Sequence, residues 1–231
     1  MKHQVVIANI QEIKMRVLEI FYSIDGEGKR AGELTTFIRL AGCNLRCVWC
    51  DTAYSHDCNA GQEMCIDAII KEVEKYGCKN ITVTGGEPLI HKDIDILLQK
   101  LSKLGYDINI ETNGSISIEK YLNAKYKNVW FTMDYKTTSS GMNSKMKQKH
   151  YMQLRKQDVL KMVVGSNKDL NEAYKVIKEC SQNKNLFYLS PVFGMIEPVQ
   201  IVEFMKKKQL YNVRIQLQLH KIIWDKDKRC V

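Results

Sequence analysis

The sequence predicts an α/β fold built as a partial barrel of the TIM type, with about six strand–helix units. Short runs rich in β-branched and aromatic residues alternate along the chain with stretches whose apolar residues recur at helical spacing. Such alternation is typical of parallel strands joined by helices. The chain has 231 residues, and a full eight-unit barrel usually has roughly 250.

Strands and helices are expected in alternating order along the chain. Ile66, Ile69, Ile70 and Val73 follow the spacing i, i+3, i+4, i+7, which marks one apolar face of a helix. The expected strands are residues 36–40, 81–84, 107–110, 129–133, 160–164, 186–189 and 213–219. The expected helices are residues 66–73, 94–101, 169–181 and 197–208.

Domain organisation is predicted to be simple. The sequence has no low-complexity segment, no repeat of fixed period and no linker rich in Pro, Gly or Ser. Residues 15–231 are therefore predicted to form a single domain. Residues 1–14 lie outside the alternation of strands and helices and are predicted to be an N-terminal extension.

Composition narrows the class of protein. Hydrophobic residues make up 45% and charged residues 26% of the chain, as in a compact globular domain. The net charge of +9 favours an anionic substrate or partner, and nucleic acid is allowed but not implied. No apolar run approaches the roughly 20 residues of a membrane span, and residues 5–8 are too short for a signal sequence. A cytoplasmic protein without a membrane partner is expected.

Three of the eight cysteines form a C-x3-C-x2-C array, Cys43, Cys47 and Cys50. Chance would produce such a triplet with a probability of roughly 1%, and a disulfide framework is not expected in a cytosolic chain. An iron–sulfur cluster held by three cysteines leaves one iron open for a substrate or cofactor. The alternatives are a structural zinc ion with His56 as fourth ligand, and inert buried thiols.

Polar residues follow several of the predicted strands at their carboxyl ends. Residues 84–88, 111–114, 134–136 and 165–167 each come directly after a strand. Any one of these loops alone is explained by ordinary turn chemistry. Because loops at the carboxyl ends of barrel strands converge on the active site, the four loops and the cysteine array together predict a catalytic centre there.

The cysteine array, with Trp49 before its last cysteine, and the later Gly85-Gly86-Glu87-Pro88 segment resemble the radical S-adenosylmethionine (SAM) superfamily. The resemblance implies a [4Fe–4S] cluster on the three cysteines and SAM on the open iron. Reductive cleavage of SAM would then give a radical that abstracts hydrogen from a neighbouring substrate. The residues implied to contact the cofactor are Trp49, Cys50, Asp51, Gly85, Gly86, Glu87, Asp134, Tyr135 and Lys136.

A narrower resemblance covers almost all of residues 15–231. Segments 19–28, 37–45, 49–52, 111–114 and 216–221 resemble the 7-carboxy-7-deazaguanine synthase family. The resemblance implies conversion of 6-carboxy-5,6,7,8-tetrahydropterin to 7-carboxy-7-deazaguanine with loss of ammonia, a step toward queuosine and other 7-deazapurines. It also implies a β6/α3-like barrel, a homodimer, Mg²⁺, and an electron donor such as flavodoxin or ferredoxin.

The same resemblance assigns roles to residues around the pterin. Thr52 is implied as the Mg²⁺ ligand, and a hard cation does prefer oxygen. The residues implied to bind substrate are Ile24, Asp25, Gly26, Glu27, Arg39, Thr84, Glu111, Gln218, His220 and Val231, of which Glu27, Arg39, Glu111 and His220 are the candidate catalytic residues.

Physical chemistry supports several of these roles and supplies a plainer alternative for each. The guanidinium of Arg39 suits a carboxylate, and the carboxylate of Glu111 can accept two N–H groups. Gln218 and His220 would point the same way on a strand. The alternatives are a surface arginine, a salt-bridged carboxylate, a core histidine and, for Thr52, a turn hydroxyl.

Three positions depart from the family's usual pattern. Many members have Gln in place of Asp25, Ser-Pro in place of Asp134-Tyr135, and Gly in place of Cys230. These differences concern side-chain contacts in the predicted site.

Two other functions are compatible with parts of the sequence. The basic stretch 136–161 suggests a nucleic-acid-binding protein with a metal cluster, but a solvated helix face explains it, and no aromatic-rich nucleic-acid motif lies near it. No nucleic-acid partner is therefore expected. An activase for a glycyl-radical enzyme is also a short radical enzyme, but it gives no reason for Glu27, Glu111, Gln218 and His220.

Overall fold

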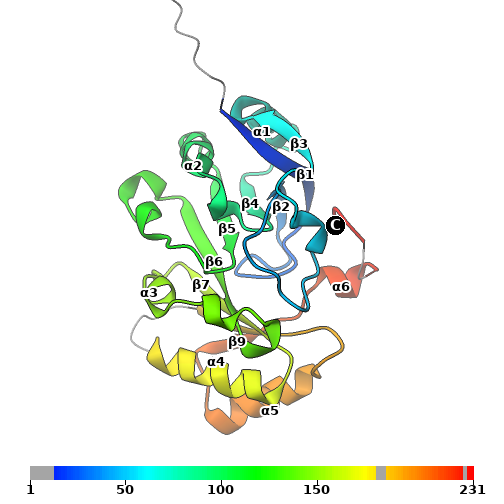
Figure 1. The fold of residues 1–231 in the computed structure, drawn as a ribbon, viewed down its shortest axis with the longest axis vertical. Coiled ribbons are helices and arrows are strands. Elements are labelled where there is room, and N and C mark those ends of the chain that lie inside the picture. Colours follow the sequence, from blue (N-terminus) through cyan, green and yellow to red (C-terminus); the bar gives the residue numbers. More distant parts are fainter. Residues whose placement is uncertain (1–12, 181–185, 226–227) are drawn as a thin grey trace, which may run out of the picture.

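The computed structural model describes residues 13–180, 186–225 and 228–231. Its strands form one nine-stranded sheet in the order β3-β1-β2-β4-β5-β6-β7-β8-β9 (Figure 1). Strands β2, β4, β5, β6, β7, β8 and β9 pair with one another in parallel. Strand β1 pairs antiparallel with both β2 and β3. The strands are β1 (Lys14–Ile24), β2 (Leu34–Leu40), β3 (Gln62–Cys65), β4 (Asn80–Gly85), β5 (Asp107–Thr112), β6 (Val129–Lys136), β7 (Val159–Val164), β8 (Leu186–Pro191) and β9 (Val213–Ile215).

Helices α1, α2, α4 and α5 pack against this sheet, whereas α6 lies apart from them near the C-terminus (Figure 1). α1 contacts β1 and β3, α2 contacts β5, α4 contacts β7, and α5 contacts β8 and β9. Because β3 and β9 do not pair with each other, the barrel stays open between the first and last strands. The helices are α1 (Ile66–Glu74), α2 (Ile94–Lys103), α3 (Gln148–Tyr151), α4 (Asn167–Glu179), α5 (Pro198–Lys208) and α6 (His220–Ile223).

Local sequence explains α4, the longest of these helices. The side chain of Ser166 accepts a hydrogen bond from the backbone N–H of Asp169 at 3.2 Å, which caps the first turn. Leu170, Ala173 and Ile177 recur at helical spacing and are buried against the sheet. Every residue of the neighbouring strand β7 is buried, as expected for a strand covered on both faces.

The predicted fold class, a partial TIM-type barrel, is confirmed, and each expected helix is present within two residues of its predicted bounds. One predicted strand is wrong in extent: β9 ends at Ile215, so residues 216–219 are not strand and His220 begins α6. Instead of pairing onward, the Gln216 side chain bonds the Gly28 backbone at 2.7 and 2.9 Å, and the Leu219 N–H donates to Gly26 O at 3.0 Å.

The sheet edge formed by β1 and β3 was not predicted from the sequence. β1 begins at Lys14, which pairs with Cys65, so this position of the predicted extension belongs to the sheet, and residues 1–12 lie outside the described residues. In the described part of the chain no helix is long and apolar enough to span a membrane.

Candidate active site

A cavity of about 560 Å³ lies at the carboxyl ends of the parallel strands, where the predicted site residues meet. The loop after β2 borders the cavity on one side, and the last residues of the chain also border it. The predicted residues that line it are Ile24, Asp25, Gly26, Glu27, Arg39, Cys43, Cys47, Trp49, Cys50, Asp51, Thr52, Thr84, Gly85, Gly86, Glu111, Asp134, Lys136, Gln218, His220 and Val231.

The three cysteines of the array lie on one loop after β2, are free thiols, and are partly exposed to the cavity. Burial raises the pKa of the Cys47 and Cys50 thiols, although the Lys136 ammonium opposes this. Arg46 shapes the loop by donating to the carbonyls of Cys43 and Leu45, each at 2.7 Å. A metal site would take the three cysteines as thiolates.

The three thiols have the chemistry of an iron–sulfur site. In a [4Fe–4S] cluster each thiolate binds a different iron, and three cysteines leave one iron open. Within the described residues no group of three or more His, Cys, Asp or Glu side chains lies close enough to hold a single metal ion.

Two glycines shape the cofactor side of the cavity. A Cβ at Gly86 would lie 2.3 Å from Gly42 O and 2.6 Å from the Cys43 Cβ, and one at Gly85 would lie 2.2 Å from Leu40 O. Only glycine lets the loop after β4 approach the cysteine loop this closely. Gly85, Gly86 and the three thiols line the same cavity, so a ligand beside a cluster on these thiols would meet backbone from the loop after β4.

Two residues predicted to contact the cofactor are not among those that line the cavity. Glu87 is fully buried and accepts hydrogen bonds from Leu89 N, Thr112 Oγ1 and Asn113 N at 3.0, 2.9 and 2.6 Å. It thereby ties the loop after β4 to the loop after β5, and its burial raises its pKa to about 7. The Tyr135 hydroxyl bonds Glu172 and Asn143 instead.

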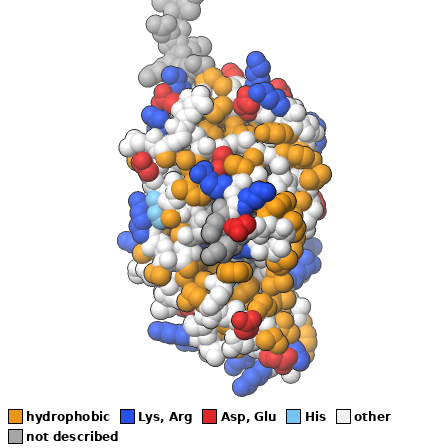
Figure 2. Space-filling view, turned by 90° about the vertical axis from the view of Figure 1, so that its right-hand side faces the viewer, with side chains coloured by type: hydrophobic (Ala, Val, Ile, Leu, Met, Phe, Trp, Pro, Cys, Tyr) orange, Lys and Arg blue, Asp and Glu red, His pale blue; other side chains and the backbone are white. Residues whose placement is uncertain are grey.

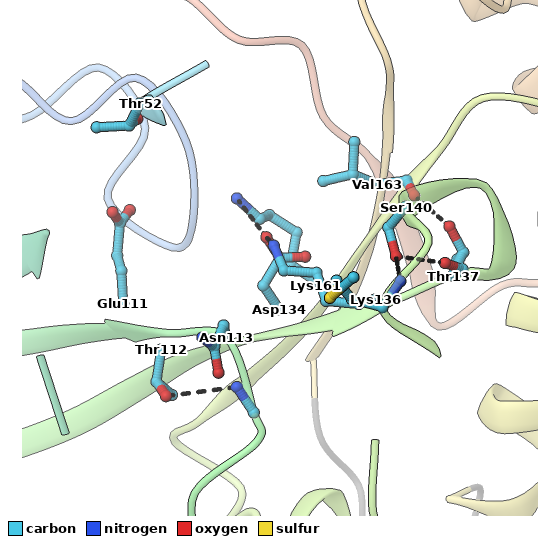
Figure 3. Close-up of polar contacts among 12 residues, drawn as sticks. Thr52, Glu111, Thr112, Asn113, Asp134, Lys136, Thr137, Ser140, Lys161 and Val163 are labelled. Atoms are coloured by element: carbon cyan, nitrogen blue, oxygen red, sulfur yellow. Dashed lines mark hydrogen bonds and ion pairs between the residues drawn. The ribbon is translucent and has the colours of Figure 1, made fainter. Parts of the chain in front are cut away.

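Four residues with alternating charges line the cavity, and Figure 3 shows three of them, Lys136, Asp134 and Lys161. Lys136 pairs with Asp134 at 2.7 Å, Lys161 lies 3.9 Å from Asp134, and Lys161 also pairs with Glu27. Burial opposes the charge on Glu27, but the Lys161 ammonium lowers the pKa of that carboxyl. Each of the four side chains is less than a fifth exposed.

Two acceptors among these four residues have no partner. Glu27 Oε1 and Asp134 Oδ1 are buried and receive no hydrogen bond from the described residues. Buried carboxylate oxygens in proteins are normally hydrogen-bonded, so both atoms are suited to N–H or O–H groups of a ligand in the cavity.

Lys161 was missed by the sequence reasoning. A signal existed, because Lys161 interrupts the apolar run of β7, and a lysine is almost never fully buried unless it is paired. Such a position indicates a buried anion nearby, although the sequence alone does not say that the anion is Glu27, far away in the chain.

Carboxyl groups from β5 and the loop after β1 face the other side of the cavity. Thr84 Oγ1 donates to Glu111 Oε2 at 2.9 Å, and Glu111 points from β5 toward the loop that carries Thr52 (Figure 3). Asp25 is buried and accepts from Thr82 Oγ1 at 3.0 Å. Burial and the nearby Glu111 charge raise the pKa of Asp25 to about 7.

His220 stands directly over the loop after β1. A Cβ at Gly26 would lie 2.2 Å from His220 Nδ1, so a side chain at this position would displace the imidazole. Burial lowers the pKa of His220, although the Glu27 charge opposes this. Gln218 receives a hydrogen bond from Lys221 Nζ at 2.7 Å, and Lys221 also pairs with Asp51 at 2.8 Å.

Arg39 and Thr52 lie in the cavity wall beside the cysteine loop. Arg39 Nε pairs with Glu19 at 2.7 Å, and sequence reasoning did not anticipate this partner. Thr52 Oγ1 donates to Asp51 Oδ1 at 2.9 Å, and its side chain borders the cavity opposite Glu111.

Comparisons with known proteins agree with this geometry. The family model for the radical SAM superfamily matches residues 37–207. The chain is 46% identical to the 7-carboxy-7-deazaguanine synthase of Clostridium acetobutylicum over 94% of this chain and 99% of the relative. It is 36% identical to that of Methanospirillum hungatei over 92% and 87% of the two chains. The crystal structure of QueE from Escherichia coli has the same fold, with a TM-score of 0.67, 21% identity, and 88% and 94% coverage.

Proposed function

This chain belongs to the radical SAM superfamily and, within it, to the 7-carboxy-7-deazaguanine synthase family, and we propose how its cavity serves that reaction. The reaction converts 6-carboxy-5,6,7,8-tetrahydropterin to 7-carboxy-7-deazaguanine with loss of ammonia. The observation that carries the proposal is the meeting, in one cavity, of three free thiols and a separate set of carboxyl and amide groups from the opposite wall.

The cofactor side would use the three thiols of Cys43, Cys47 and Cys50 to hold the [4Fe–4S] cluster of the superfamily. The cluster and SAM, when bound, supply the electron and the radical that abstracts a substrate hydrogen. The chain's own contribution on this side is shape. Gly85 and Gly86 let two loops meet, and Glu87 fixes the second loop from behind.

The pterin side would use side chains for recognition. Glu111 and the unpartnered Glu27 Oε1 are acceptors for pterin N–H groups, and Lys161 holds Glu27 charged and in place. Arg39 would bind the substrate carboxylate, because a guanidinium donates several hydrogen bonds in one plane. His220 and Gln218 would contact the ring from above.

Mg²⁺ would bind at Thr52, with the remaining ligands supplied by substrate oxygens and water. Thr52 and Glu111 border the same space, and Mg²⁺ commonly takes few protein ligands and keeps several waters. The family resemblance also predicts a homodimer, a flavodoxin or ferredoxin as electron donor, a place in the queuosine pathway and a cytoplasmic location. These stay predictions.

The function is tested on anaerobically reconstituted protein supplied with SAM, a chemical reductant, Mg²⁺ and 6-carboxy-tetrahydropterin. We expect the deazapurine chromophore to appear, and the electron paramagnetic resonance signal of the reduced cluster to change when SAM binds. Cys50→Ser should abolish both, whereas Cys58→Ser, at an exposed cysteine outside the array, should leave both intact.

Other outcomes would identify a rival. SAM cleavage that never yields a deazapurine but installs a radical on a glycyl-radical protein would identify an activase. A stoichiometric zinc ion without iron would exclude radical chemistry altogether.

A further inference from the structure

Glu19 joins the cavity wall to the end of the chain. It lies on β1, where the register with β2 shifts between Val17 and Glu19, so that Leu18 is an extra residue. The shift brings Glu19 opposite Arg39 across the strand pair. Bulges of this kind often re-aim a side chain next to an active site.

The two oxygens of the Glu19 carboxylate face different partners. Oε1 accepts from Arg39 Nε at 2.7 Å and from the Tyr54 hydroxyl at 2.9 Å, and both of these residues belong to the cavity wall. Oε2 accepts from Arg229 Nη2 at 2.9 Å and from Cys230 Sγ at 3.3 Å. One buried carboxylate therefore holds the wall with one oxygen and the end of the chain with the other.

The C-terminal tail, residues 228–231, lines the cavity along its whole length. Its guanidinium, Arg229, also lies 3.8 Å from the centre of the Tyr54 ring. Cys230 has a φ of 58°, a backbone conformation that side chains other than glycine rarely adopt. The tail is thus held in place by contacts, not by backbone preference.

Charge explains why these contacts depend on Glu19. Arg39 and Arg229 carry like charges and share this one carboxylate. Hydrogen bonds between ionised groups are stronger than neutral ones, especially when the acceptor is shielded from water. The Glu19 side chain is 9% exposed.

The protein face that bears α6 and the C-terminus shows basic and acidic side chains grouped near its centre (Figure 2).

We propose that Glu19 is a positioning residue that latches the C-terminal tail over the pterin side of the cavity and aims Arg39 at the same ligand. In this role Glu19 does not touch the substrate. It acts through Arg39 on one side and through residues 229–231 on the other. The proposal rests on the proposed function, since the ligand that it positions is the pterin.

The latch is tested without substrate, by treating the folded full-length protein with a carboxypeptidase and measuring release of Val231 by mass spectrometry. A protease removes residues only from a tail that has lifted away. Glu19→Gln and Arg229→Ala should each release Val231 at least ~10-fold faster than the parent, because each removes a charge-assisted bond. Arg229→Lys should restore most of the protection.

The matched control is Glu63→Gln. Glu63 lies on β3 beside β1 and forms an exposed 3.5 Å ion pair with Lys14, which is not a tail residue. The Glu63→Gln variant should release Val231 at the parent's rate. If Glu19→Gln does not fold, as circular dichroism would show, the two Arg229 variants decide alone.

The positioning role is tested by kinetics. Arg229→Ala should raise the KM for 6-carboxy-tetrahydropterin about 10-fold, while SAM cleavage measured without pterin stays at the parent's rate.

Two results would overturn the proposal. Equal release of Val231 from parent, Glu19→Gln and Arg229→Ala would remove the latch, and faster release with an unchanged KM would remove the positioning role. Failure to form any deazapurine would refute the proposed function instead, and the release assay would still report on the latch.

Discussion

The two sides of the cavity are built in different ways. The cofactor side consists of two loops in backbone contact, with glycines at the points of closest approach and a buried carboxyl that fixes one loop from behind. The pterin side consists of charged side chains brought together from β1, β2, β5, β7 and the end of the chain. The first side depends on shape and the second on charge pairs, so the two should fail differently when they are altered.

The largest effect is expected on the cofactor side, from Gly86→Ala. The added Cβ would meet Gly42 O at 2.3 Å and the Cys43 Cβ at 2.6 Å, and backbone cannot move aside as a flexible side chain can. Cys43 would be displaced, so we expect complete loss of the cluster by iron analysis and electron paramagnetic resonance.

Gly77→Ala is the control for this substitution. Gly77 has a φ of 64° but nothing within 4 Å of an added Cβ, so the variant tests backbone strain without a clash. It should lose about 1–2 kcal/mol of stability and keep its cluster. A Gly86→Ala protein with full iron content would show that close approach is not what defines this side.

On the pterin side the largest effect is expected from Lys161→Met. Among the residues that the structure describes, removing the lysine leaves Glu27 without a Lys or Arg ion pair and Asp134 with Lys136 alone. Breaking a buried ion pair in this way costs about 3–5 kcal/mol, because a charge is left buried and unpaired. Urea unfolding of the apo-protein measures the loss.

A second variant separates charge from packing. Glu27→Gln combined with Lys161→Met removes both charges, and the double variant should recover much of the stability lost by Lys161→Met. If the double variant is as unstable as the single one, Lys161 contributes by packing, and the pterin side is not organised by this pair.

Glu111→Gln tests whether the two sides are separable in catalysis. The amide keeps the size of the side chain and its bond with Thr84 but loses the charge that suits pterin N–H groups. Because a shift of about 1 Å in reacting geometry costs on the order of 100-fold, deazaguanine formation should fall about 100-fold. SAM cleavage should continue without productive turnover.

The exposed Glu119→Gln serves as the control for charge removal and should behave as the parent. If Glu111→Gln lowers SAM cleavage without substrate as much as product formation, Glu111 belongs to the cofactor side or to folding.

The same division explains what the sequence could predict. Cys43, Cys47 and Cys50 lie within eight residues of each other, and the Gly85-Gly86-Glu87 segment is local too, so the cofactor side was recognisable as motifs. Even there, spacing alone did not show that the Glu87 side chain bonds Asn113 and is absent from the residues that line the cavity.

The pterin side depends on partners that are distant in sequence. Glu27 was predicted from a resemblance, but its partner Lys161 lies 134 residues away, and Gln216 clamps Gly28 from 188 residues away. No local pattern encodes such pairs. The error over residues 216–219 has the same origin, because their alternation resembles a strand until the long-range bonds to Gly26 and Gly28 are known.

The most gradual effect, spread over several pH units, is expected at Asp25. Burial and the Glu111 charge raise the pKa of Asp25 from an ordinary 3.8 to about 7. At a pH between these two values Asp25 is therefore protonated in the folded protein and ionised in the unfolded chain. Stability from this group is therefore full at low pH and declines as pH rises toward about 7, by at most about 1.4 kcal/mol per pH unit. Above that pH the group adds no further slope.

Asp25→Asn should remove this decline, because an amide does not titrate. Glu87, whose burial also raises its pKa to about 7, contributes the same slope to both proteins, so the difference between their unfolding free energies isolates Asp25. Urea unfolding between pH 4.5 and pH 7 should give profiles that diverge steadily, with the variant gaining relative to the parent as pH rises. Parallel profiles would mean that Asp25 is charged in the folded protein, where the Arg30 guanidinium, 3.4 Å away, would neutralise it much as Lys161 neutralises Glu27.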